Sequence, residues 1–393
     1  MSAVFHHGRE GDAGPLGGVR VLDLSAYIAG PYGCSLLADQ GADVIKVEPP
    51  GGDNLRNYPS TLEAESRAFV GVNRSKRGLV LDLKCEDERA VLYRLLREAD
   101  VLVHNFRPGV PERLGIGYDT LSALHPRLIY CAVTGYGETG PMKDKAGYDQ
   151  VLQTMTGMCA MQGKRGGPPE LIYGSVVDYY AAALLAAGVS SALYERERSG
   201  LGQYVGVSLL RSALTMQSAR MVWAQGEGHD IGRDMRSGGV TGIHPTREGH
   251  LYISANTPRF WRALCEKTGL GALAEDPRLD TVRKRAEHAD LILPHLHAAL
   301  QAHGALEWEE IFGEDVPCAA ARRVEDMFDH PQVLAEEMIA EIEHPSLGSY
   351  RGVSRPIRFG RTPGPAPFAA PTLGQHGEQI RAAVAEAGAP DEP

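Results

Sequence analysis

The chain has 393 residues, a formal charge of −10 and no basic run longer than the short cluster at residues 74–77, so nucleic acid is not an expected partner. Its length exceeds the size at which a single core stops growing, which favours two domains. The six cysteines are scattered and form no C-x-x-C pair, as is typical of a reducing compartment, so we expect a cytoplasmic protein.

Neither the N-terminus nor any later segment predicts membrane insertion. Residues 1–18 are polar and glycine-rich and lack the apolar stretch of a signal peptide, so a flexible N-terminus is expected. The longest weakly polar run, residues 179–194, is shorter than the roughly 20 residues that a membrane span needs. We therefore expect no membrane association, and interpret this run as a buried helix.

The first third of the chain alternates strand and helix patterns. A short apolar strand at residues 20–24 is followed by a helix at 32–40 and a second strand at 44–47, which together form one βαβ unit. The pattern continues with strands at 78–83, 101–103 and 128–133 and helices at 86–98 and 118–125. The predicted class is α/β, with a doubly wound, Rossmann-like parallel sheet and a ligand crevice at the carboxyl ends of its strands.

The later sequence predicts the domain boundaries. The large α/β domain is expected over residues 19–225, ending with a strand at 205–210 and a helical stretch to about 225. Residues 226–248 are rich in Gly and Arg and predict a linker or lid. A smaller α+β domain is expected at 249–330. The segment 331–393 is expected to return to the large domain, with a Pro- and Gly-rich extended arm from residue 356.

Known nucleotide-binding motifs are missing from this sequence. No G-x-G-x-x-G follows the first strand, and no G-x-x-x-x-G-K-[ST] occurs. A hydride-transfer or P-loop function therefore loses its main support.

Asp178 is the only carboxylate in the apolar, small-residue run at 171–194. One interpretation is a helix start, because Ser175 and Asp178 have the spacing of a capping box. The other is a nucleophile in a partly desolvated pocket. This segment alone leaves both open.

Motifs in a fixed order make the chain similar to the class III CoA-transferases, a family related to the α-methylacyl-CoA racemases. The segments are GVRVLDLS at 18–25, AGP at 29–31, LADQGADVIKVE at 37–48, NRSKR at 73–77, LDLK at 81–84, HNFRPG at 104–109, RLG at 113–115, GYGETGP at 135–141, GYD at 147–149, ERSGLGQ at 197–203 and VPCA at 316–319. Together they are specific, whereas each alone would be weak.

The resemblance implies transfer of CoA from an acyl-CoA to a free carboxylic acid, with Asp178 as the nucleophile that forms a mixed anhydride and then an aspartyl-CoA thioester. Backbone N–H groups near Asp178 are expected to stabilise the oxyanions. A CoA thioester is the substrate, and neither a permanently bound cofactor nor a metal is expected. The family fold implies an interlocked homodimer.

The resemblance also implies a set of CoA-binding residues. They are Arg74, Lys76, Arg77, Asn105, Phe106, Arg113 and Lys145, with Lys143 as the alternative to Lys145. Cationic side chains suit phosphates, although a charge cluster such as 74–77 is commonly a solvated surface. Phe106 is expected either against the adenine or in the core.

Tyr148 separates the two possible activities. The related racemases have a histidine there, and moving a proton on and off carbon needs a base that titrates near neutral pH. A phenol ionises near pH 10 in water and suits a hydrogen-bond donor better. Tyr148 therefore favours the transferase, with an α-methylacyl-CoA racemase as the alternative.

Two further departures from the family bear on the substrate. Tyr27 and Ile28 replace a glutamine of the oxalate-using branch, which disfavours oxalate and leaves a larger acid, including a dicarboxylate, as the expected acceptor. The glycines of residues 238–242 are a candidate lid, although such runs are more often linkers.

Overall fold

The computed structural model describes residues 4–5, 14–162, 167–227 and 239–386. They divide into two compact units, which we treat separately. The first contains the described residues up to Val222 together with those from Pro331, and the second contains those between Trp223 and His330. Of the expected linker, residues 228–238 lie outside the described residues, and Gly238 of the candidate lid is among them.

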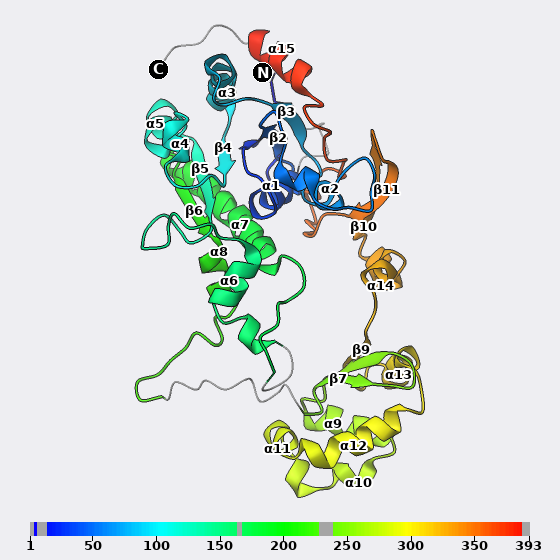
Figure 1. The fold of residues 1–393 in the computed structure, drawn as a ribbon. Helices are drawn as coiled ribbons and strands as arrows, with labels where there is room; N and C mark the ends of the chain where they lie inside the picture. The colour runs from blue at the N-terminus through cyan, green and yellow to red at the C-terminus, as the bar shows by residue number, and fades with distance from the viewer. Residues whose placement is uncertain (1–3, 6–13, 163–166, 228–238, 387–393) are drawn as a thin grey trace. The chain divides into compact units, whose positions relative to one another are not determined.

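A six-stranded parallel sheet forms the centre of the first unit (Figure 1). The strands are β1 (Arg20–Asp23), β2 (Asp43–Glu48), β3 (Arg77–Val80), β4 (Val101–His104), β5 (Ile129–Thr134) and β6 (Tyr204–Ser208). Their order is β3-β2-β1-β4-β5-β6, and every neighbouring pair is parallel. This is the doubly wound order: β2 and β3 follow on one side of β1, and the chain then returns to add β4, β5 and β6 on the other side. The prediction of a mixed α/β protein with a parallel sheet is confirmed.

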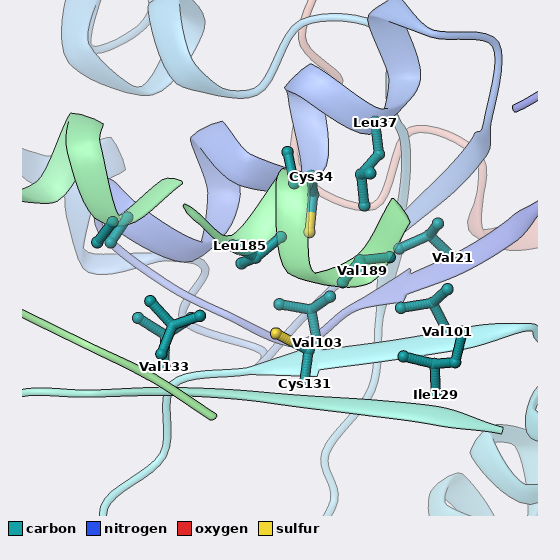
Figure 2. Packing of buried hydrophobic residues seen from close by; sticks show 14 of the residues in the cluster. Val21, Cys34, Leu37, Val101, Val103, Ile129, Cys131, Val133, Leu185 and Val189 are labelled. Atoms are coloured by element: carbon teal, nitrogen blue, oxygen red, sulfur yellow. The ribbon is translucent and has the colours of Figure 1, made fainter. Parts of the chain in front are cut away.

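Side chains alternate between the two faces of the sheet, and each face has its own apolar core. Val21 packs with α1 and α7 on one face, whereas its neighbour Leu22 packs with α3, α5 and α15 on the other. Figure 2 shows the first core, where Cys34 and Leu185 from the helices meet Val103 from the sheet. The helices of this unit are α1 (Ala29–Asp39), α2 (Arg67–Val72), α3 (Glu86–Glu98), α4 (Val110–Arg113), α5 (Tyr118–Leu124), α6 (Asp149–Met155), α7 (Val176–Ser199), α8 (Leu209–Thr215), α14 (Pro331–Ala335) and α15 (Gly377–Glu386).

Helix α7 is long and apolar enough to cross a membrane by length and composition alone, but one of its faces is covered by protein. Ala181, Leu185 and Val189 are fully buried between α1 and the sheet. Tyr179 and Tyr194 lie on the uncovered side, with 43% and 70% of their surface exposed. The expected fully buried helix is thus only half buried, since small residues let one face pack closely while tyrosines remain on the other.

The C-terminal part of the first unit contains a hairpin and, within the expected extended arm, a helix. Strands β10 (Ile339–His344) and β11 (Gly348–Val353) pair as an antiparallel hairpin. After an irregular stretch the chain forms α15, whose Ile380 and Val384 are buried in the second core of the sheet. The Pro- and Gly-rich composition up to residue 374 concealed this last helix, because its apolar positions number only a few.

The second unit has its own sheet and core. Strands β7 (Gly242–Pro245), β8 (His250–Ile253) and β9 (Cys318–Ala320) form an antiparallel sheet. The helices are α9 (Pro258–Lys267), α10 (Gly271–Ala274), α11 (Val282–Glu287), α12 (Ala289–Leu300) and α13 (Ala305–Phe312). The helical stretch expected to reach residue 225 ends instead with α8 at Thr215.

Candidate active site

The site lies where β1 and β4 end, at the point where the sheet reverses its order. Asn105, directly after β4, bridges the two strand ends: its side-chain oxygen accepts from the Ala26 N–H at 2.9 Å, and its amide donates to the Ala26 carbonyl at 2.7 Å. Both ends of the Asn105 amide are therefore used to fix the loop after β1. Asn105 also lines the cavity.

Tyr27, in that loop, has a left-handed backbone with φ 67°. A tyrosine there costs conformational energy, so the surrounding structure must impose it. Its N–H donates to Asp53 at 3.1 Å, and Asp53 forms a buried ion pair with Lys46 at 3.0 Å. Lys46 also donates to the Ser25 carbonyl at 2.8 Å. Buried Asp53 and Lys46 thus fix the loop that places Tyr27 in the cavity.

The basic cluster at residues 74–77, which the sequence assigned to CoA, does not line the cavity among the described residues, and its contact with CoA stays a prediction. Arg74 pairs with Asp39, and Arg77 pairs with Asp43 at 2.8 Å. Lys76 is fully buried and donates to Asp23, Asn73 and the Pro31 carbonyl at 2.7–2.8 Å. All three cations are neutralised inside the fold, because α1, β1 and β2 supply carboxylates to meet them.

Asp23 is the other half of the Lys76 pair. Burial by itself would raise the pKa of Asp23, but the charges of Lys76 and Lys46 outweigh it and lower the pKa to about 2. The carboxylate also accepts from the Ser25 N–H at 3.0 Å. The cluster is therefore an ionised network that supports the loop under the site.

A cavity of about 270 Å³ lies beside the loop that this network supports. Its lining includes Asn105 and Phe106 together with three tyrosines, two lysines and two acids: Tyr27, Tyr58, Tyr148, Lys143, Lys145, Asp149 and Asp178. The rings of Tyr27 and Tyr148 meet edge to face at 5.9 Å. Burial and the nearby Tyr148 hydroxyl raise the pKa of Tyr27, so this phenol keeps its proton and can donate.

Asp178 lies in the first turn of α7 but does not cap it. The expected capping box is wrong, because Ser175 makes no side-chain hydrogen bond at the helix start. Asp149, from the start of α6, accepts instead from the N–H groups of Val177 at 2.6 Å and Asp178 at 3.0 Å. The Asp178 carboxylate is left to face the cavity. These two amides are occupied, so they are unavailable to an oxyanion.

The environment makes Asp178 an unusual acid. Desolvation by burial, and secondarily the nearby Asp149 carboxylate, raise the pKa of Asp178 from 3.8 to about 7. A raised pKa makes the ionised form more basic and more nucleophilic than an exposed aspartate.

Phe106 lies between this cavity and a second one. It lines both, and the second has a volume of about 300 Å³ with apolar walls that include Leu24, Val47 and Leu114 and with Lys84 among its lining residues. Arg113, at the end of α4, is exposed and is not among the lining residues of either cavity.

The sequence analysis missed Asp149, Tyr58 and the strain at Tyr27. Asp149 was noted only as part of a motif, and the signal that could have identified it is an acid at a helix start followed four residues later by Gln153, which donates to it. Within the described residues no group of three His, Cys, Asp or Glu side chains is arranged to hold a metal.

Comparison with known proteins identifies consistent relatives. Residues 16–377 match the family model of CoA-transferase family III. The chain is 34% identical to succinyl-CoA–D-citramalate CoA-transferase of Chloroflexus aurantiacus, over 93% of each chain. It is 36% identical to acetyl-CoA:oxalate CoA-transferase of Acetobacter aceti, over 83% of this chain and 85% of the relative. A crystal structure of a CAIB/BAIF family protein from Brucella suis superposes with a TM-score of 0.84 at 30% identity, covering 95% of this chain and all of that one.

Proposed function

Since this chain belongs to CoA-transferase family III, whose members move CoA between acyl-CoA thioesters and carboxylates, we propose that Asp178 carries the exchange by covalent catalysis. The observation that carries the proposal is a partly desolvated carboxylate, with a pKa near 7, that faces the cavity at a helix start capped by another residue. An acyl transfer that keeps the energy of the thioester needs such a nucleophile.

The exchange proceeds in four balanced steps. An oxygen of Asp178 attacks the donor thioester carbon, which forms a mixed anhydride and expels the CoA thiolate. The thiolate attacks the aspartyl carbon, releases the donor acid and leaves an aspartyl-CoA thioester. The acceptor carboxylate then attacks that carbon, expels the thiolate and forms a second anhydride. Thiolate attack on the acceptor carbonyl finally releases the new acyl-CoA and regenerates the Asp178 carboxylate.

Hydrogen-bond donors for the oxyanions come from the cavity wall. The phenols of Tyr27 and Tyr148 line the same cavity as Asp178, and the raised pKa of Tyr27 favours its protonated form. A positioned hydroxyl stabilises charge as it develops on the carbonyl oxygen. Tyr148 also supplies no base for moving an α-proton, which disfavours racemisation.

Phe106 lines both cavities, and we assign the two ends of the extended CoA molecule to one cavity each. The thioester end is assigned to the cavity of Asp178, and the flat base to the apolar slot beside Leu24 and Leu114. Lys143 and Lys145, both exposed in the loop before α6, are assigned to the phosphates from among the cations that line the two cavities, which also include Arg107 and Lys84. This arrangement replaces the assignment of residues 74–77.

For the acceptor we propose a carboxylic acid with a second polar group. The cavity wall has phenols and cations beside an apolar floor, so it offers partners to a distal carboxylate. Two relatives are named for citramalate and oxalate, and both acids belong in the panel of acceptors to be assayed despite the change at Tyr27.

We expect Asp178→Ala to lower CoA transfer by at least 10³-fold, because the covalent route is lost. The measurement is mass spectrometry of the products formed from acyl-CoA donors and carboxylate acceptors. In the wild-type protein, hydroxylamine added after acyl-CoA should convert residue 178 to a hydroxamate. An Asp178→Ala protein that retains transfer would refute the proposal. Exchange of the α-proton with deuterated water would support the racemase instead.

We also propose a homodimer, which would cover the uncovered face of α7. Apolar side chains on this face and beside it are exposed: Val151, Met155, Leu171, Tyr173, Tyr179 and Tyr194. Exposed apolar side chains of this kind suit an interface with a second chain. Sedimentation equilibrium at micromolar concentration should give twice the chain mass of 42.4 kDa, and a monomer would contradict the assignment.

A further inference from the structure

We propose that Asp149 is a positioning residue for the nucleophile. Its carboxylate accepts the hydrogen bonds of the backbone N–H groups at the start of α7. Asp178 therefore faces the substrate without hydrogen bonds from these N–H groups and beside a second negative charge. The inference rests on the proposed function, because it assumes that Asp178 attacks the thioester.

The contacts of Asp149 show that this arrangement is built into the fold. Asp149 is 2% exposed and accepts from the N–H groups of both Val177 and Asp178. Gln153, one turn later on α6, donates to Asp149 and fixes the approach to α7, since its oxygen accepts from the Ile172 N–H at 3.0 Å. Asp149 therefore cannot turn away from the helix start without breaking several buried hydrogen bonds.

The start of a helix usually stabilises a carboxylate, because free N–H groups and the helix dipole favour the negative charge. An aspartate in the first turn, such as Asp178, would ordinarily benefit and become a weaker nucleophile. Here the N–H groups of Val177 and Asp178 donate to the Asp149 carboxylate instead. Asp178 keeps a place in the same turn but meets a like charge, which is the second cause of its raised pKa after burial.

Other ionisable groups around Asp178 do not replace this effect. Lys143, Lys145 and Arg107 line the same cavity, and so do Tyr27, Tyr58 and Tyr148. Among all of them, Asp149 is the only one whose charge contributes to the shift of Asp178 within the described residues.

The test uses Asp149→Asn, which keeps a side-chain oxygen to accept from the two amides and removes the charge. We expect the acid limb of kcat/KM, near pH 7 in the wild type, to move to lower pH by roughly one unit, the size of effect that one neighbouring charge produces. The same shift is expected in the carboxyl carbon resonance of Asp178, assigned by its loss in Asp178→Asn and followed by ¹³C NMR. The resonance needs no activity, so an inactive variant still gives a result.

Two comparison variants separate charge from structure. Asp100→Asn removes a carboxylate that pairs with Arg196 at the far end of α7, and it should leave the Asp178 resonance unmoved. Gln153→Leu breaks the hydrogen bonds but keeps the Asp149 charge, and it should lower stability without moving the titration downward. An unchanged Asp178 titration in Asp149→Asn overturns the inference. Full transfer by Asp178→Ala would instead refute the proposed function, whatever the titration shows.

Discussion

We expect Asp178→Asn to make the protein more stable at pH 8 by up to about 4 kcal/mol. The folded state holds the pKa of Asp178 at about 7, against an ordinary value of 3.8 for an aspartate, a difference of roughly three units at about 1.4 kcal/mol each. A raised pKa means that the folded state binds the proton more tightly. The wild type therefore loses stability as the pH rises from about 4 to about 7, whereas the asparagine variant does not.

The measurement is the midpoint of urea unfolding for both proteins from pH 4 to pH 8. The gain from Asp178→Asn should grow across this interval and level off above pH 7. Asp119→Asn is the matched control, because Asp119 also lies in the first turn of a helix but is exposed. A gain that is the same at every pH would mean that the ionisation of Asp178 is not its cause. A gain that grows with pH would measure the stability that the wild type loses by keeping the Asp178 carboxylate in a desolvated site.

Lys76→Met is expected to destabilise the protein by about 3–5 kcal/mol, the usual cost of leaving a buried charge without its partner. Asp23 is fully buried, and Lys46 then remains as its only nearby cation among the described residues. The measurement is again urea unfolding, at pH 7. If Lys76 instead met CoA from the surface, stability would hold and only the KM for acyl-CoA would rise.

Lys145→Met is the matched variant for that comparison. Lys145 is exposed and lines the cavity of Asp178, so we expect unchanged stability and a KM for acyl-CoA raised by roughly tenfold, as for the loss of one charged contact. Lys143→Met, measured beside it, shows which of the two lysines binds the phosphates. Unchanged KM in both variants would remove this loop from the CoA site.

The strands of the parallel sheet followed from local patterns, because each strand or helix in this unit has its own periodicity, whereas their order in the sheet came from the structure. Residues 20–24, 44–47 and 101–103 are short apolar runs, and each is a strand of the central sheet. The end of the chain did not follow, since α15 is held by its contacts with the sheet rather than by its own sequence.

The candidate site divided in the same way. The order of the motifs singled out Asp178 and Tyr148, and both line the cavity. The ion pairs of the basic cluster could not be predicted, because a sequence shows the charges of Arg74, Lys76 and Arg77 but not the carboxylates that meet them from distant strands and helices.

The sequence by itself determined the α/β class, the family and an aspartate at the start of a long helix. It could do so because periodicity and motifs are local properties. Only the tertiary structure determined the hydrogen bonding around that aspartate and its pKa. Asp149, 29 residues away in the chain, takes the helix amides, and burial raises the pKa of Asp178. Solvation and charge at a site depend on which groups the fold brings together, and no local pattern contains that information.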